Sequence, residues 1–136
     1  VSGAEAASAR YILEKRLKLN NPPLIAMGDA ADKPNPEGFL FLANQLMENS
    51  LGSNTPPIAY VGDTVADVTT IINARQKVPS QTFISIAIAP PHLHNESLRE
   101  ERILYESKLK ESGADILLNS INDIKNIYVN LLADYK

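Results

Sequence analysis

The sequence predicts an α/β fold in which helices pack on a mostly parallel sheet. Short apolar runs, typical of buried strands, alternate with longer segments whose apolar residues recur at helical spacing. Glycine, proline or asparagine separates most of these segments. No internal repeat, low-complexity tract or linker interrupts the alternation, so we expect residues 1–136 to belong to one domain.

The first half of the chain contains two predicted helices and one complete strand. Residues 4–19 are rich in alanine and leucine and form a helix that ends at residues 20–23, two asparagines and two prolines. Residues 24–27 are a wholly apolar run of the kind that forms a buried parallel strand. Asn35 and Pro36 are typical of the N-cap and first position of a helix. Its predicted buried residues are Phe39, Leu42, Ala43, Leu46 and Met47.

Two further strands flank a third helix. Residues 58–61 and residues 83–89 are the apolar runs that predict these strands. Residues 64–75 lie between them and have apolar residues at helical spacing, namely Val65, Val68, Ile71, Ile72 and Ala74. The connection over residues 90–112 is longer than a plain crossover needs, so we expect it to be an addition to the basic fold.

The last third of the chain predicts a helix, a strand and a helix. Residues 96–111 form a charged helix, and Gly113 suits the position just after its end. Its thin apolar seam consists of Leu98, Leu104 and Leu109. Residues 114–118 form the last short strand. Ser120 and Asp123 resemble a capping box at the start of the final helix.

Composition narrows the class of protein. A net charge of −3 and a pI of about 5.3 give no electrostatic reason to expect a nucleic acid or an acidic membrane as partner. No apolar run approaches the roughly 20 residues that span a bilayer. The lack of cysteine excludes disulfides and fits a cytoplasmic protein. Because the first residue is valine rather than methionine, we expect a processed or truncated chain.

Two aspartates follow the strand predicted at residues 58–61. Asp63 comes directly after Gly62, and Asp67 comes one helical turn later, so both lie on the same side of the next helix. Open α/β sheets bind ligands at the carboxyl ends of their strands, and carboxylates suit a hard cation such as Mg²⁺. The pattern therefore indicates a metal site. A capping interaction between Thr64 and Asp67 explains the same residues equally well.

Two other strand ends carry residues suited to phosphate. Lys33 precedes Pro34, which restricts the backbone of the lysine and aims its ammonium group. Ser2 and Gly3 end a predicted strand and offer a hydroxyl and a backbone N–H before a helix, an arrangement that binds phosphate. Taken singly, Lys33 also reads as a solvated loop lysine and Ser2 as an N-cap.

Together, the three strand ends resemble the haloacid dehalogenase-like (HAD) hydrolase superfamily, subfamily IA in particular. Ser2 matches its second motif, the Lys-Pro-Asn-Pro at residues 33–36 its third, and the Gly-Asp-x-x-x-Asp at residues 62–67 its fourth. The resemblance runs from Val1 to about residue 132. It implies a Rossmann-like three-layer sandwich with a mostly parallel sheet, the HAD-like core.

The first motif of that family, an Asp-x-Asp that supplies the nucleophile and the general acid/base, does not occur in the chain. Asp29 and Asp32 have the wrong spacing. We therefore expect the nucleophile, the first strand and the cap domain to lie upstream of Val1, which leaves the core incomplete on its N-terminal side. The resemblance places that strand in the middle of the sheet, so we expect the missing N-terminal half, or a partner that supplies the strand, to be needed for stability.

The resemblance implies a Mg²⁺-dependent phosphatase of a small phosphorylated metabolite that acts through an aspartyl-phosphate. Asp63 and Asp67 are the implied metal-site residues, Ser2, Gly3 and Lys33 the phosphate-binding residues, and Lys33, Asp63 and Asp67 the catalytic ones. With the nucleophile outside the chain, we expect this segment to be inactive by itself.

Other functions stay open. The chain is alternatively a non-catalytic HAD-like remnant or half of a split protein that binds metal, phosphate or a partner. A receiver-like signalling domain would need an acidic pair after its first strand, which the chain also lacks. His92 and His94 have a spacing that allows metal binding, but loop histidines are the simpler interpretation. Asp29 and Asp32 either border the site or are solvated loop residues.

Overall fold

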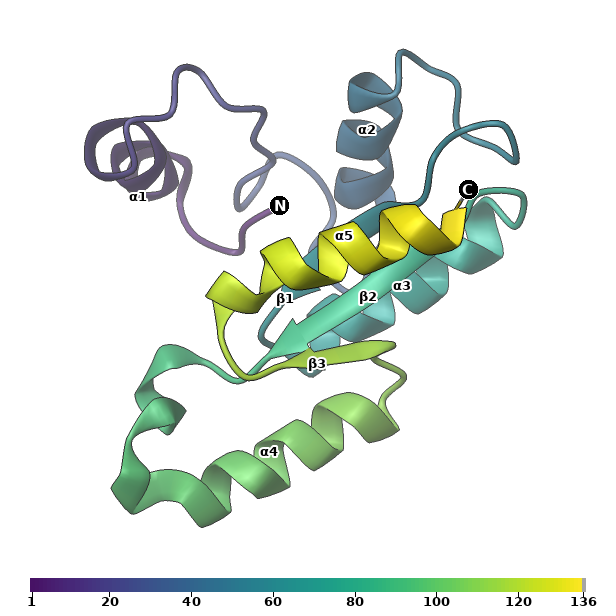
Figure 1. Cartoon of the computed structure of the whole chain (residues 1–136). Helices are drawn as coiled ribbons and strands as arrows, with labels where there is room; N and C mark the ends of the chain where they lie inside the picture. Colours follow the sequence, from purple (N-terminus) through teal and green to yellow (C-terminus); the bar gives the residue numbers. More distant parts are fainter. Residues whose placement is uncertain (136) are drawn as a thin grey trace. The chain divides into compact units, whose positions relative to one another are not determined.

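The computed structural model describes residues 1–135 and divides into two compact units. The first unit comprises residues 1–58 and 69–83, and the second comprises residues 59–68 and the chain from residue 84 onward. The chain is mixed α/β with a small, open, parallel sheet, which confirms the predicted fold class at that level (Figure 1).

The sheet lies mainly in the second unit. Within residues 1–135 it contains three strands, β1 (Ile58–Gly62), β2 (Phe83–Ile88) and β3 (Ile116–Leu118), in the order β1-β2-β3. β2 and β3 run parallel, with Ala87 opposite Leu117. All three strands lie where the apolar runs predict them, because these runs are rich in isoleucine and other residues that fit a buried pleated surface.

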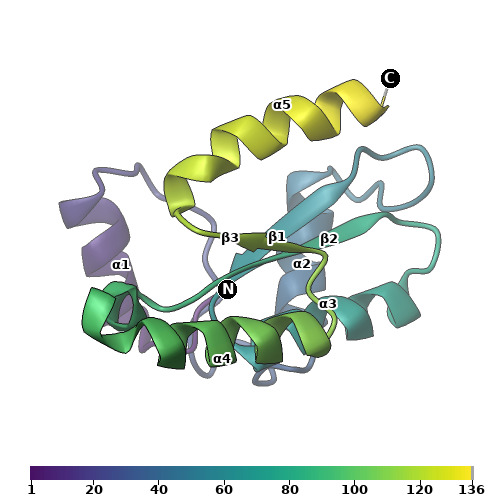
Figure 2. The same ribbon diagram turned by 60° about the horizontal axis from the view of Figure 1, so that its bottom comes forward.

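Two helices complete the second unit. α4 (Arg99–Glu111) lies beside β3 and covers one side of the sheet (Figure 2). A 3₁₀ turn, Pro91–His94, precedes it, and Gly113 follows with φ of +114°, as the predicted helix-ending glycine requires. α5 (Ile124–Tyr135) follows a 3₁₀ turn whose cap, Ser120, forms the predicted capping box.

The first unit is mainly helical. The helix predicted at residues 4–19 forms as α1 (Ala6–Arg10) followed by a π-helical segment, Tyr11–Arg16. α2 (Glu37–Leu46) begins one residue later than predicted, and the Asn35 side chain accepts a hydrogen bond from the Glu37 N–H at 2.9 Å. The ring of Phe39 in α2 meets the Phe83 ring edge to face at 5.4 Å.

α3 (Val65–Lys77) begins in the second unit and continues in the first. Its Val68, Ile71 and Ala74 side chains are buried, as predicted. None of the helices within residues 1–135 is long and apolar enough to cross a bilayer.

The strands predicted at residues 1–3 and 24–27 do not form. The backbone N–H of Ser2 donates to the Ile25 carbonyl, and that of Met27 donates to the Ala4 carbonyl, so the two segments do lie together. However, the only β-bridge near residues 24–27 in the described chain joins Met27 to Ala30 across a tight turn. A strand needs a continuous ladder of partners, and these isolated hydrogen bonds do not supply one.

Three leucine and valine residues that were predicted to be buried are exposed. Val65 and Leu46 are the first residue of α3 and the last of α2, and their exposed fractions are 44% and 61%. Leu104 is 65% exposed although Leu109 is completely buried. Five residues turn an α-helix by about 140° beyond one full turn, so Leu104 and Leu109 face different directions.

Candidate functional site

A pocket of about 560 Å³ opens where the three strands of the second unit end. We call it the strand-end pocket. Its size falls within the range of about 300–1,000 Å³ that is typical of small-molecule sites. Its walls come from the ends of all three strands and the segments that follow them: Val61, Gly62, Asp63, Ile88, Ala89, Pro91, His94, Asn119, Ser120 and Ile121. Every one of these residues belongs to the second unit.

Asp67 organises the turn that carries Asp63. Its Oδ2 accepts hydrogen bonds from the backbone N–H groups of Asp63 and Thr64, at 3.2 and 3.0 Å, and from the Thr64 hydroxyl at 2.7 Å. The Thr64 Oγ1 in turn accepts from the Asp67 N–H at 3.2 Å. The capping interaction between Thr64 and Asp67 is therefore present, and it fixes the backbone from which the Asp63 side chain projects.

Gly62 is required by the close approach of Asp67. A Cβ at position 62 would lie 2.3 Å from the Asp67 Cβ and 2.8 Å from its Oδ2. Asp67 is only 3% exposed, so its carboxylate has little room to move away. The glycine in the Gly-Asp-x-x-x-Asp pattern is thus a steric consequence of folding the second aspartate back over the strand end.

Tyr60 completes the surroundings of Asp67. Its hydroxyl donates to Asp67 Oδ1 at 3.1 Å. Burial raises the pKa of the Tyr60 phenol well above its ordinary value, and the adjacent Asp67 carboxylate raises it further. The Tyr60 phenol is therefore a neutral hydrogen-bond donor at ordinary pH. Nothing in the sequence pattern singled out Tyr60.

Asp63 differs from Asp67 in its contacts. Its side chain is half-buried and lines the strand-end pocket. Within its own unit, the Asp63 carboxylate accepts no hydrogen bond from any described residue, whereas its backbone carbonyl accepts one from the Tyr105 hydroxyl at 2.7 Å. Burial, and to a lesser extent the Asp63 and Asp67 carboxylates, raise the pKa of the Tyr105 phenol.

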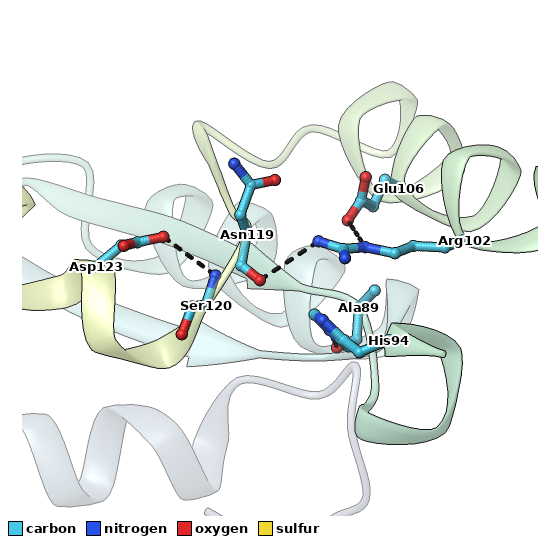
Figure 3. Close-up of polar contacts among 7 residues, drawn as sticks. All are labelled: Ala89, His94, Arg102, Glu106, Asn119, Ser120 and Asp123. Atoms are coloured by element: carbon cyan, nitrogen blue, oxygen red, sulfur yellow. Dashed lines mark hydrogen bonds and ion pairs between the residues drawn. The ribbon is translucent and has the colours of Figure 1, made fainter. Parts of the chain in front are cut away.

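The segment between β2 and β3 ties down the ends of all three strands. The Tyr105 hydroxyl binds the carbonyl after β1, at Asp63. The His94 Nε2 lies 2.8 Å from the carbonyl of Ala89, which follows β2, and an Arg102 guanidinium nitrogen lies 3.3 Å from the carbonyl of Asn119, which follows β3 (Figure 3). Since carbonyl oxygens only accept, His94 carries its proton on Nε2 in this contact.

Arg102 is held in place by a second contact. Its Nε donates to the Glu106 carboxylate at 2.7 Å, and both side chains are mostly buried (Figure 3). The connection over residues 90–112, expected from its length to be an addition to the fold, therefore forms one wall of the strand-end pocket and braces the rim. Neither Tyr105 nor Arg102 was predicted, because each sits among exposed helical residues that give no local signal.

The predicted phosphate-binding residues meet in the first unit. Ser2, Gly3 and Lys33 line one small recess of about 20 Å³, together with Asp32. The Ser2 hydroxyl accepts a hydrogen bond from the Ala4 N–H at 3.1 Å. The helix predicted to start beside Ser2 begins only at Ala6, so Ser2 and Gly3 sit in a turn that precedes α1 rather than at its cap.

Other predicted candidates have structural partners. Asp29 accepts a hydrogen bond from the Ala26 N–H at 2.9 Å and so stabilises the turn after residue 27. The Nε2 nitrogen of His94 contacts the Ala89 carbonyl, and His92 lies exposed in the same 3₁₀ turn. Within the described chain no three His, Cys, Asp or Glu side chains are grouped closely enough to hold a metal by themselves.

The structure thus brings Asp63 and Asp67 together in the second unit, and Ser2, Gly3 and Lys33 together in the first. The roles of Asp63 and Asp67 as metal ligands and of Ser2, Gly3 and Lys33 as phosphate ligands stay predictions. Comparison with models of known families and with curated proteins finds no match to the chain.

Proposed function

We propose that this chain belongs to a Mg²⁺-dependent phosphohydrolase of the HAD type that acts on a small phosphorylated substrate. One observation carries the proposal: the Asp63 carboxylate stands at the carboxyl end of a parallel strand, lines the strand-end pocket and accepts no hydrogen bond from a described residue of its unit. Withdrawing a carboxylate partly from water without a partner is costly, and a bound cation offsets that cost.

The oxygen donors around Asp63 fit a hard cation. Asp63 is the ligand that this chain would provide, and Mg²⁺ ordinarily takes only one or two carboxylates and completes its shell with water and substrate oxygens. Asp67 Oδ2 already accepts three hydrogen bonds, so Asp67 is assigned the task of positioning the Asp63 backbone. Bound Mg²⁺ supplies charge stabilisation at the phosphoryl oxygens.

Lys33 and Ser2 are assigned to the phosphoryl group. They line one recess in their unit. An ammonium group and a hydroxyl are suited to offset and orient phosphoryl oxygens. In the proposed reaction an aspartate from outside this chain attacks phosphorus, the ester P–O bond breaks, and the leaving oxygen takes a proton. Water then hydrolyses the aspartyl-phosphate to free phosphate and restores the aspartate.

A non-catalytic protein is the second candidate, because no Asp-x-Asp occurs in the 136 residues. In that case the same residues bind phosphate or metal without turnover. For either function, we propose that the N-terminal half of the same protein or a partner supplies a further strand to the sheet. We place the protein in the cytoplasm, since a chain without cysteine draws no benefit from an oxidising compartment.

The test is a screen of the full-length protein against small phosphate monoesters. We expect phosphate release that requires Mg²⁺, stops with a chelator and returns when Mg²⁺ is added back. Failure to release phosphate from any ester would contradict the enzymatic proposal. Saturable binding of inorganic phosphate without turnover would then favour the non-catalytic protein.

A further inference from the structure

The strand-end pocket is more apolar than phosphoryl chemistry requires. Besides Asp63, its walls consist largely of hydrocarbon, contributed by Val61, Ile88, Ala89, Pro91 and Ile121. A phosphate group and a hydrated cation gain nothing from such a surface, because both prefer polar donors and acceptors. The hydrocarbon walls therefore suit another part of a ligand.

Several polar groups on the rim already have partners. The Ala89 carbonyl is bonded by His94 and the Asn119 carbonyl by Arg102 (Figure 3). The Ser120 N–H donates to Asp123 at 3.1 Å, and the Ser120 hydroxyl accepts from the Asn122 N–H at 3.2 Å.

A ligand rich in hydroxyl groups would lose its hydrogen bonds to water in this pocket, and the rim groups named above already have hydrogen-bond partners within the protein. An apolar group would lose no hydrogen bonds and would cover hydrocarbon on both sides. The rim is also preformed, since side chains from the 90–112 connection hold each strand end in place. The pocket thus favours an apolar ligand group that enters beside Asp63.

We propose that the strand-end pocket binds the apolar leaving group of a phosphate monoester. The preferred substrates are then aryl or branched alkyl phosphates, and polyhydroxylated sugar phosphates are disfavoured. The identification of the ligand as a phosphate ester rests on the proposed phosphohydrolase function. The binding of an apolar group depends only on the pocket.

Ile121 provides the test, because its side chain lines the pocket and is 53% exposed, so replacing it costs little stability. Ile103 in α4 is 52% exposed and is not among the residues that line the pocket, which makes it a matched control. In the full-length protein with Mg²⁺, hydrolysis of phenyl phosphate and of glycerol 3-phosphate is compared for wild type, Ile121→Asp and Ile103→Asp.

We expect wild type to prefer phenyl phosphate, and Ile121→Asp to raise the KM for phenyl phosphate about tenfold. The KM for glycerol 3-phosphate should rise by a smaller factor, and the kinetics of Ile103→Asp should not change. A preference for glycerol 3-phosphate, or equal effects of the two substitutions, would overturn the inference.

A second measurement separates the pocket from the reaction. Phenol is titrated into the full-length protein, and backbone NMR shifts are followed at Ile88 and Ala89, which line the pocket and are unchanged in the variant. Shifts that appear in wild type and disappear in Ile121→Asp support the pocket even if neither ester is hydrolysed, in which case only the proposed function fails. The absence of shifts in wild type would overturn the inference whatever the kinetics show.

Discussion

Replacing Gly62 by alanine tests how the structure positions Asp63. The new methyl group would lie 2.3, 2.5 and 2.8 Å from Asp67 Cβ, Cγ and Oδ2. These separations are far below van der Waals contact, and all three atoms belong to a buried side chain on the first turn of α3. The Asp67 side chain therefore has to shift and give up part of its hydrogen bonding.

The expected loss of stability follows from the hydrogen bonds that the Asp67 carboxylate accepts. Its carboxylate accepts hydrogen bonds from the Tyr60 hydroxyl, from the Asp63 N–H, and from both the N–H and the hydroxyl of Thr64. Hydrogen bonds to a charged group contribute about 1.5–3 kcal/mol each, so losing one of them costs about 1.5–3 kcal/mol. The lower entropy of alanine in the unfolded chain offsets about 0.4–1 kcal/mol. We expect a net loss of about 1–2.5 kcal/mol in the free energy of unfolding.

Urea unfolding followed by circular dichroism measures this loss. Gly3→Ala is the control, because a Cβ at position 3 meets no atom within 4 Å and the glycine does not adopt a positive φ. The control should change the free energy of unfolding by less than about 0.5 kcal/mol. If Gly62→Ala is as stable as Gly3→Ala, the explanation of the glycine as a space for Asp67 is wrong.

Two further predictions concern the tyrosines. The pKa of the Tyr60 phenol is raised in the folded protein and is about 10 in the unfolded chain, so above pH 10 the unfolded state binds fewer protons. The free energy of unfolding in metal-free buffer should therefore fall from about pH 10 upward. Tyr60→Phe should make that fall shallower. A fall of equal slope in Tyr60→Phe would contradict this assignment. Tyr105→Phe should cost about 1 kcal/mol in urea unfolding by removing the bond to the Asp63 carbonyl, and no change in stability would show that this contact does not brace the rim.

Local patterns predicted the features that depend only on neighbouring residues. The Ser120 capping box, the Gly113 helix end and the Thr64–Asp67 interaction all form as the sequence indicates. Each involves residues no more than a few positions apart, whose geometry is set by the helix terminus itself.

Features that depend on distant residues were not predictable in the same way. Residues 24–27 have the composition of a strand, but no continuous ladder forms along them in the described chain. The bonds from Tyr105 and Arg102 to strand-end carbonyls join residues 42 and 17 positions apart. Such contacts depend on how β3 and α4 pack, so composition and spacing gave no sign of them.

The role of Asp63 is tested most directly by comparing Asp63→Asn with wild type in the full-length protein. The assay measures the phosphate released from a reactive monoester over a range of Mg²⁺ concentrations. Asparagine keeps the size of the side chain and removes its charge, and Glu101→Gln, a neutralised exposed carboxylate on α4, is the control. We predict that Asp63→Asn abolishes Mg²⁺-dependent release while its stability and that of the control stay near wild type. Full Mg²⁺-dependent release by Asp63→Asn would contradict the assignment of Asp63 as the metal ligand.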